Sequence, residues 1–426
     1  MTLKLPPNSD KFKTKFRLVE LELNSILEIT QAINNNMPEE ALYMMYKFTL
    51  RANLRVEKMA IYVLEEDNEW HCKVHFGTPK DFEKKLPISL LEQNIRDITD
   101  LKGFPLSEDA LFLEIFDLIV PVYHKEQVLA YVLLENNPAG GFLLDDEQGR
   151  ELDTRFVQTL SNIIIVAIEN KKLFRKQINQ EAMKRELEIA KKVQSMLFPE
   201  TLPYHEHLKI KATYFPHDLI GGDYYDYIPI NNDKFIFCIA DVSGKGVPAA
   251  LLMSNFQASL RTLARQTNDL LQIVEELNYQ IFQNARGEHF ITCFICIYDR
   301  NQKLFEYINA GHNPAFLFDM QNNAELTLLE KGTTVLGAFS PLPFIESSCI
   351  TIENFLLFTY TDGITEARSM EEEEYGLDRL IQFMHTQSQT DLKKIHENLI
   401  AEIDNFRQEN PYNDDITLLS CRIKPF

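Results

Sequence analysis

The chain has 426 residues, of which 45% are hydrophobic, so it can form about two or three domains with cores of their own. Its 63 acidic and 43 basic residues give a net charge of −20 without a basic block, which argues against nucleic acid or an anionic membrane as a partner. Six cysteines do not make a disulfide framework in a chain of this length, and the N-terminus lacks the apolar stretch of a signal peptide, so we expect a cytoplasmic protein.

Helical and strand patterns alternate in the N-terminal part of the chain. Apolar residues recur at helical spacing over residues 16–34, and Pro38 with the two glutamates after it opens a second helix. A last helix is expected to begin after residues 145–147. Between these helices, strand patterns occur at residues 59–64, 70–76, 118–122 and 128–134.

This order of elements predicts a separate α+β domain at residues 16–168, preceded by a tail at residues 1–15. The order resembles that of a GAF domain, a small sensory fold common in bacterial signalling proteins. Its ligand is not identified by the sequence, and a GAF-like domain that docks a partner with an empty pocket is an alternative to a ligand sensor. Four side chains could be imagined as ligands of a chromophore, haem or metal: His71, Cys72, His75 and His124. Neighbours on a strand face opposite ways, so we expect core or surface positions for them instead.

A helical linker is predicted at residues 169–198. This stretch contains neither proline nor glycine and is rich in lysine, glutamate, glutamine and leucine. Its apolar positions do not form one unbroken heptad, and Gln177 and Gln180 fall in the middle. A coiled-coil seam and a plain amphipathic connector therefore both stay open.

Strands and helices alternate again in the predicted domain at residues 199–426. Strands are predicted at residues 210–215, 235–240, 290–298, 304–309, 350–360 and 416–423. Helices are predicted at residues 249–265, 270–284, 377–385 and 392–406. This pattern suits two packed sheets flanked by helices.

Four short aspartate segments punctuate this domain, at residues 221–223, 241–244, 361–363 and 413–415. Three of them border strand patterns, so several carboxylates can converge at one end of a sheet. Clustered carboxylates repel one another, and Mg²⁺ and Mn²⁺, which prefer oxygen ligands, relieve that repulsion. Aspartate beside glycine is also ordinary turn chemistry. Spacing alone leaves a metal-dependent phosphoryl hydrolase and a set of plain turns as alternatives.

The motifs around these aspartates resemble those of SpoIIE/RsbU-type phosphatases of the protein phosphatase 2C (PPM) superfamily. The matching stretches, in family order, are residues 186–194, 197–199, 220–226, 240–246, 309–314, 361–367 and 413–417. The resemblance covers more than half of the chain. It implies an α/β/β/α sandwich for the C-terminal domain, within an α+β chain, and a protein-serine/threonine phosphatase as the activity.

The resemblance also implies a role for each motif residue. Asp241 would bridge two divalent cations, Mn²⁺ or Mg²⁺, and the backbone carbonyl of Val242 would be a further ligand. Asp362 and Asp414 would hold the second ion, and Asp223 would hold the first, directly or through a water. A water activated by the two ions would attack phosphorus in line, without a phospho-enzyme. Residues expected to orient these ligands or to shape the backbone around them are Asp226, Asp415, Gly222, Gly244 and Gly363.

Other polar residues of this domain leave open questions. His312 lies in a Gly-His-Asn-Pro turn that belongs to the family pattern, and a structural role and a role as general acid are both possible. Cys293 and Cys296 lie on opposite faces of a predicted strand, so we expect buried side chains and no redox or zinc pair. The sequence offers no counterpart of the phosphate-binding arginine of eukaryotic relatives, so how the substrate phosphate is held is undetermined.

The family resemblance further implies a substrate and an assembly. The substrate would be a phosphorylated STAS-type anti-sigma-factor antagonist, and the phosphatase would control transcription by partner switching. Related proteins often dimerise through the linker helix, which reports the sensor state to the phosphatase, so a homodimer is implied.

Two alternatives come from other functional classes. A non-catalytic pseudophosphatase adaptor would bind partners through the GAF-like domain and the linker, and the presence of all four predicted ligand carboxylates argues against it. A Mg²⁺ phosphohydrolase acting on a small metabolite is also disfavoured, because no second aspartate stands two residues after Asp241.

Overall fold

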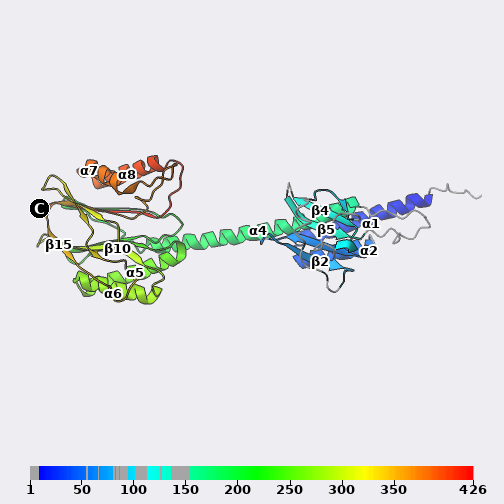
Figure 1. Cartoon of the computed structure of the whole chain (residues 1–426), viewed down its shortest axis with the longest axis horizontal. Coiled ribbons are helices and arrows are strands. Elements are labelled where there is room, and N and C mark those ends of the chain that lie inside the picture. Colours follow the sequence, from blue (N-terminus) through cyan, green and yellow to red (C-terminus); the bar gives the residue numbers. More distant parts are fainter. Residues whose placement is uncertain are drawn as a thin grey trace, which may run out of the picture. The chain divides into compact units, whose positions relative to one another are not determined.

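The computed structural model describes residues 9–53, 56–65, 67–79, 82, 86, 95–101, 113–124, 127–135 and 154–425. The chain divides into two compact units, Met1–Glu181 and Ala182–Phe426. Figure 1 shows the elements of both units. Residues 1–8 of the expected tail and the predicted helix start at residues 145–147 lie outside the described residues.

The N-terminal unit is built on an antiparallel sheet with strand order β2-β1-β5-β4-β3. The strands are β1 (Met59–Leu64), β2 (Trp70–Phe76), β3 (Thr99–Asp100), β4 (Leu118–His124) and β5 (Gln127–Leu134). Residues of α1 (Ser9–Asn34), α2 (Glu39–Asn53) and the first part of α4 (Thr154–Ser195) share one hydrophobic core with this sheet. The expected α+β region is therefore present. The helix predicted at residues 16–34 begins earlier, at Ser9, and the two-residue strand β3 was not predicted.

Of the four side chains considered as ligands in this unit, only His71 belongs to a group of described residues that could hold a metal, and its neighbours there are Glu65 and Asp67. His71 hydrogen-bonds Asp67 (Nε2–Oδ2 2.8 Å), and His75 hydrogen-bonds Thr78 (Nδ1–Oγ1 2.7 Å). These contacts are local along the chain, as expected for surface positions on a strand.

One helix, α4, continues from the N-terminal unit into the C-terminal unit. The last helix of the predicted N-terminal domain and the predicted linker are therefore a single element, with no break at residue 168 and an end at Ser195. Several of its large apolar side chains are exposed in the single chain, namely Leu173, Phe174, Ile178, Met183, Ile189 and Val193. Within the part of the chain that the structure describes, no helix combines the length and apolar character that a membrane span needs.

The C-terminal unit contains two six-stranded sheets packed face to face. One consists of β8 (Tyr224–Pro229), β9 (Lys234–Val242), β10 (Ile291–Asp299), β11 (Leu304–Ala310), β14 (Gly332–Thr333) and β15 (Ser348–Thr351). The other consists of β6 (Tyr204–His205), β7 (Leu208–Phe215), β12 (Ala315–Asp319), β13 (Glu325–Leu329), β16 (Phe355–Tyr360) and β17 (Ile416–Ile423).

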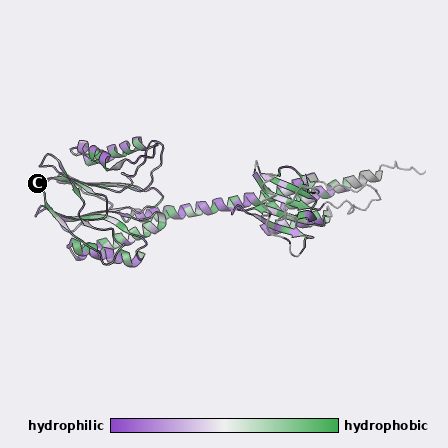
Figure 2. Ribbon diagram, in the orientation of Figure 1, coloured by the Kyte–Doolittle hydropathy of each residue, from purple (hydrophilic) through white to green (hydrophobic). Residues whose placement is uncertain are grey.

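Two pairs of helices cover the outer faces of these sheets (Figure 1). α5 (Gly246–Gln266) and α6 (Leu270–Ala285) pack on the first sheet, and α7 (Gly376–Gln387) and α8 (Leu392–Arg407) pack on the second. Each helix carries both hydrophobic and hydrophilic colours in Figure 2, as expected for a helix with one face on a sheet and one in solvent. The predicted α/β/β/α sandwich is therefore confirmed.

The sequence of strand β9 is a continuous apolar run because the strand is buried on both faces. Phe237 and Ile239 point into the core between the sheets, whereas Ile236 and Cys238 point into the core under α5 and α6. A strand that is buried on both faces loses the polar alternation of a surface strand. The same sandwiched position explains the buried, opposed side chains of Cys293 and Cys296 on β10.

The single strand predicted at residues 350–360 is wrong. The chain forms β15 and β16 there, and the two strands belong to different sheets: β15 pairs with β11, and β16 pairs with β12 and β17. The turn at Glu353 and Asn354 carries the chain from one sheet to the other. Ile350 and Ile352 before the turn and the apolar residues of β16 after it read as one β-forming run, so sequence periodicity does not reveal the change of sheet. Strands β8, β12 and β13 were also not predicted.

Candidate metal centre and active site

The predicted carboxylates come from strand ends that lie next to one another. Asp223 directly precedes β8, and Asp241 lies near the end of β9, where the antiparallel register pairs Tyr224 with Ala240. In the other sheet, Asp362 follows β16 and Asp415 precedes β17, and the register pairs Tyr360 with Leu418. Antiparallel neighbours bring the end of one strand beside the start of the next.

Two threonines hold Asp223 between the sheets. The side chain of Asp223 is 1% exposed, and its Oδ2 accepts hydrogen bonds from Thr361 Oγ1 (2.8 Å) and Thr417 Oγ1 (2.5 Å). The backbone amide of Thr417 in turn donates to Thr361 Oγ1 (2.8 Å). The sequence analysis did not single out these threonines, although each lies within a stretch that matches the family, residues 361–367 and 413–417.

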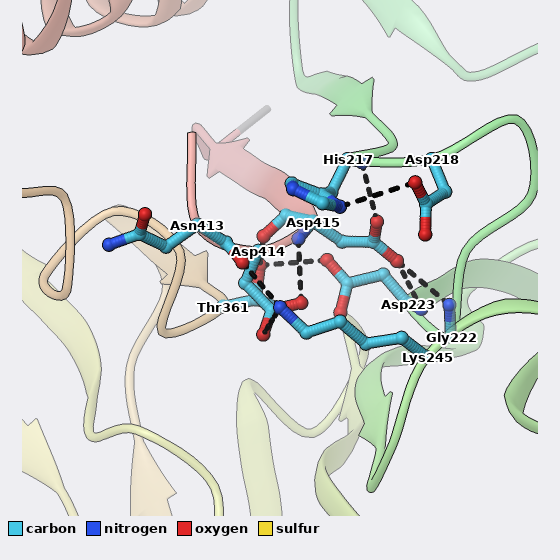
Figure 3. Close-up of polar contacts among 9 residues, drawn as sticks. All are labelled: His217, Asp218, Gly222, Asp223, Lys245, Thr361, Asn413, Asp414 and Asp415. Atoms are coloured by element: carbon cyan, nitrogen blue, oxygen red, sulfur yellow. Dashed lines mark hydrogen bonds and ion pairs between the residues drawn. The ribbon is translucent and has the colours of Figure 1, made fainter. Parts of the chain in front are cut away.

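Asp415 fixes the loop that carries Asp223 (Figure 3). Its Oδ1 accepts from the backbone amide of His217 (2.7 Å), and its Oδ2 accepts from the amides of Gly222 (2.7 Å) and Asp223 (3.4 Å). A Cβ at Gly221 would lie 2.1 Å from Asp415 Oδ2, so the close approach requires glycine. The side chain of Asp415 thus contacts the backbone beside Asp223, as a residue that orients a ligand would.

Three carboxyl groups of the cluster, those of Asp223, Asp241 and Asp362, share one electrostatic feature: their pKa values are raised. Burial, followed by the charges of Asp241 and Asp415, raises the pKa of Asp223 well above its usual range. Burial and the charges of Asp362 and Asp414 raise the pKa of Asp241 to about 7. Burial and the charges of Glu366 and Asp414 raise that of Asp362 to about 6. Without a cation, the state in which all of these carboxyl groups are ionised is therefore disfavoured.

Glycines shape the backbone around the cluster. A Cβ at Gly222 would lie 3.0 Å from the carbonyl oxygen of Val242, the predicted backbone ligand, and would crowd it. A Cβ at Gly363 would lie 2.1 Å from the carbonyl oxygen of Asp415. Gly244 has a φ of +91°, which lets the chain turn sharply after β9.

A lysine that the sequence analysis missed completes the rim of the cluster. Lys245 Nζ lies 3.0 Å from Asp414 Oδ2 and also donates a hydrogen bond to the carbonyl oxygen of Asn413 (Figure 3). The charge of Lys245 also lowers the pKa of Asp362, against the larger effect of burial.

The expected orienting role of Asp226 is wrong. Its carboxylate is fully buried and binds Arg261 of α5 in a bidentate ion pair (Nε–Oδ2 2.8 Å, Nη2–Oδ1 3.1 Å). The hydroxyl of Tyr224 and the backbone amide of Tyr227 donate to the same carboxylate. Asp226 pairs with Cys238 in the sheet register, and Cys238 faces the helix layer. Side chains alternate between the two faces of a strand, so the position of Asp226 on β8 directs its carboxylate toward the helices and away from the strand end where Asp223 lies.

His312 lies behind the cluster. Its Nδ1 hydrogen-bonds Thr292 Oγ1 (2.8 Å), and Thr292 is the neighbour of Asp241 on strand β10. Asn309 Oδ1 accepts from the backbone amide of His312 (2.7 Å). Burial lowers the pKa of His312 to about 4, so the imidazole is neutral near pH 7. These contacts favour the structural role of His312 over that of a general acid.

The end of α4 also contacts the loop that carries Asp223. Gln194 is buried, and its Nε2 donates to the carbonyl oxygen of Gly221 (2.7 Å) while its Oε1 accepts from the Gly221 amide (3.4 Å). Gly221 stands two residues before Asp223. Sequence reasoning placed Gln194 only within a family motif and gave no reason for its position.

The donor set of the cluster fits hard divalent cations. Carboxylates at Asp223, Asp241, Asp362 and Asp414 supply oxygen atoms near adjoining strand ends. The raised pKa values of Asp223, Asp241 and Asp362 reflect unbalanced negative charge. Mg²⁺ and Mn²⁺ take such oxygen ligands.

Comparisons with known proteins identify a matching family and several relatives. The family model described as Stage II sporulation protein E (SpoIIE) matches residues 231–424. The chain is 32% identical over 248 residues to phosphoserine phosphatase RsbU of Bacillus subtilis, covering 58% of this chain and 72% of RsbU. It is 28% identical over 290 residues to protein IcfG of Synechocystis sp., covering 61% of this chain and 45% of IcfG.

Two further relatives extend the comparison. Phosphoserine phosphatase RsbP of Bacillus subtilis is 29% identical over 187 residues, covering 43% of this chain and 46% of RsbP. The solved SiaA-PP2C domain of Pseudomonas aeruginosa shares the fold at 20% identity with a TM-score of 0.52, covering 58% of this chain and 99% of that domain. The chain therefore belongs to the SpoIIE-type family of PP2C phosphatases.

Proposed function

We propose that this chain is a metal-dependent protein phosphatase of bacterial signalling that hydrolyses phosphoserine or phosphothreonine. The observation that carries the proposal is the cluster of Asp223, Asp241 and Asp362, whose pKa values are raised by burial and by neighbouring carboxylates. The names of RsbU and RsbP, both phosphoserine phosphatases, support this substrate class.

Two divalent cations, Mn²⁺ or Mg²⁺, would be held by the carboxylates of Asp223, Asp241, Asp362 and Asp414 and by the carbonyl of Val242. When bound, such ions neutralise phosphoryl charge and supply an activated water. The chain's own residues prepare the site for them. Thr361 and Thr417 fix one oxygen of Asp223, and Asp415 fixes the backbone on which Asp223 stands.

The decisive experiment measures release of phosphate from a phosphoserine protein or from para-nitrophenyl phosphate, with and without Mn²⁺ or Mg²⁺. We expect activity that needs the metal and is lost in Asp241→Asn and in Asp362→Asn. If both variants keep their activity, the cluster has no role in the reaction.

The pseudophosphatase adaptor is the competing function, and the same assay separates the two. A full chain without metal-dependent activity, assayed again as its C-terminal unit and still inactive, would favour the adaptor. Retention of all four predicted ligand carboxylates supports the enzyme.

Regulation through α4 is the second part of the proposal. In it, the N-terminal α+β unit is a GAF-like sensor, and α4 carries its state to the phosphatase. The contact that supports this route is the buried pair of hydrogen bonds between Gln194 and Gly221, beside the Asp223 loop. We expect Gln194→Ala to lower kcat about tenfold and to lower thermal stability, because the Gly221 backbone groups lose their buried partner, whereas Gln177→Ala, on the exposed part of α4, should change neither. Equal kcat values for both variants and wild type would contradict this route.

The assembly and the target complete the proposal. Exposed apolar side chains of α4, such as Leu173, Ile178 and Val193, support a homodimer formed along this helix. Light scattering of the full chain and of a Leu173→Glu, Ile178→Glu variant tests it, since a dimer should dissociate in the variant.

We propose a phosphorylated STAS-type anti-sigma-factor antagonist as the target. Dephosphorylation of such a protein in preference to an unrelated phosphoserine protein is the expected result.

A further inference from the structure

Lys245 contributes a positive charge to a pocket that is otherwise acidic. Among the described residues that line this pocket, the acidic ones are Asp218, Asp241, Asp414 and Asp415, and Lys245 is the one lysine or arginine. The imidazole of His217 also lines the pocket, and it lies 3.5 Å from the carboxylate of Asp218. A phosphate that enters meets mainly negative charge, and Lys245 opposes that repulsion.

The backbone presents Lys245 at a defined place. Gly244 and Gly246 on either side of it have positive φ values of +91° and +71°, and Lys245 itself is extended (φ −132°, ψ 163°). This glycine-lysine-glycine turn links the end of β9, which carries Asp241, to the start of α5. A Cβ at Gly246 would meet no atom within 4 Å, so the space beside the turn is open.

The present contacts of Lys245 are of a kind that can be exchanged. Its ammonium pairs with Asp414 and with the carbonyl of Asn413, but the side chain is 47% exposed. Ion pairs this exposed contribute little to stability. The lysine stem is flexible, so the ammonium can move without a change in the backbone.

We propose that Lys245 binds the phosphoryl group of the substrate, exchanging Asp414 for a phosphate oxygen when the site is loaded. This inference rests on the proposed phosphatase function. A phosphomonoester carries about two negative charges near pH 7, more than the single charge of Asp414. Cations held at Asp414 would offset the charge that now attracts Lys245, which leaves the ammonium available to the phosphate. Lysine binds phosphate as a point charge, and here it would take the place of the absent arginine.

A purely structural role for Lys245 makes different predictions. A tether between the β9–α5 turn and the Asn413–Asp414 segment would affect folding and metal affinity through Asp414. It would not affect the binding of phosphate to protein that is already saturated with metal. The two roles can therefore be separated by measuring each kind of binding directly.

The experiment uses the full chain as wild type, Lys245→Gln, Lys245→Arg and the control Lys393→Gln. Lys393 lies in the first turn of α8, pairs with Glu397 and is outside the pocket, so it controls for the loss of one helix-terminal lysine. Calorimetry measures the Kd of Mn²⁺, and then that of inorganic phosphate with Mn²⁺ saturating. Steady-state kinetics with para-nitrophenyl phosphate gives KM and kcat.

We expect Lys245→Gln to weaken phosphate binding and raise KM about tenfold or more, with the Kd of Mn²⁺ changed less than about threefold. Lys245→Arg should restore phosphate binding, and Lys393→Gln should match wild type. Unchanged phosphate binding in Lys245→Gln, or a loss that only parallels weaker Mn²⁺ binding, would overturn the inference. A wild type that binds phosphate through Lys245 but releases none from substrates would instead refute the phosphatase function and leave the anion site standing.

Discussion

Each unit of the chain contains a cluster of acidic side chains, and the two clusters differ in what balances their charge. In the N-terminal unit, ligand atoms of Glu65, Asp67 and His71 lie within 4.8 Å of one another. A hydrogen bond from Lys73 lowers the pKa of Glu65, and the backbone amide of Glu69, followed by His71, lowers that of Asp67. Nearby donors already stabilise this cluster in its charged form.

The cluster in the C-terminal unit has the opposite behaviour. Burial and neighbouring carboxylates raise the pKa values of Asp223, Asp241 and Asp362, so their charged forms are disfavoured. Acidic side chains gather in both units, so their gathering does not by itself distinguish the two clusters. What distinguishes the second is burial of charge that its hydrogen-bond donors do not balance, which is the condition that a divalent cation relieves.

The largest expected effect follows from neutralising the centre of the second cluster. Asp241→Asn removes one negative charge from the predicted bridging position, and we expect the Kd of Mn²⁺ to rise more than about a hundredfold, beyond the usual effect of residues behind the ligands. Titration calorimetry measures it, with circular dichroism as the control for folding. A Kd within about threefold of wild type would show that the two clusters do not differ in the way described.

A smaller loss is expected behind the ligands. Asp415→Asn places an amide group against the backbone amides of His217 and Gly222, so the loop that carries Asp223 loses part of its anchoring. We expect Mn²⁺ affinity to fall about 10- to 100-fold. The matched control is Asp391→Asn, since Asp391 caps α8 and bonds Tyr204 and Lys209, outside the pocket. Equal effects of both variants on Mn²⁺ affinity would contradict the assigned role.

The stability of the metal-free protein should depend on pH through the second cluster. In the folded chain the pKa values of Asp241 and Asp362 are about 7 and about 6, against an ordinary value of 3.8. At pH values between 3.8 and these raised pKa values, the folded state therefore binds more protons than the unfolded state. Their contribution to stability is complete below about pH 4 and is lost as the pH rises through 6 and 7.

Thermal unfolding in EDTA at about pH 5.5 and about pH 7.5 tests this dependence. We expect Tm to fall with rising pH more in wild type than in an Asp241→Asn, Asp362→Asn double variant. Added Mn²⁺ should raise the Tm of wild type at the higher pH. The same pH slope in both proteins would mean that the two carboxyls do not titrate as described.

The smallest effect is expected in the N-terminal cluster. Glu65→Gln combined with Asp67→Asn removes charges that Lys73 and nearby backbone donors already stabilise, so Mn²⁺ affinity and phosphatase kcat should stay within about twofold of wild type. Calorimetry and the phosphate-release assay measure both. Loss of a second class of Mn²⁺ sites in this variant would show that the first cluster also binds cations.

Sequence reasoning predicted the elements better than the connections between them. Strands β1, β2 and β9 were found because continuous or alternating apolar runs mark them. The run at residues 350–360 was predicted as one strand because β-forming residues occur on both sides of the turn, although β15 and β16 pair in different sheets. Periodicity records burial, and it does not record which neighbour a strand pairs with.

The motifs in the sequence predicted the family and, through that resemblance, the sandwich, and the strand patterns predicted that several aspartate motifs could converge. Each motif combines a strand end with a turn, and antiparallel pairing brings such ends together. The direction of each side chain was decided by the tertiary structure. Asp226 and Asp415 were given the same expected role, yet Asp226 faces Arg261 under α5, whereas Asp415 holds the loop of Asp223.

The contacts of the remaining site residues could also not be predicted from the sequence. Gln194 hydrogen-bonds Gly221, which is 27 positions away in the chain, and Thr417 hydrogen-bonds Asp223, which is 194 positions away. Lys245 forms an ion pair with Asp414, about 170 positions away. Each of these side chains is ordinary for its local element. A local pattern specifies helix, strand or turn, but such contacts exist only after the two sheets and α4 have packed together, which is why only the tertiary structure assigned them.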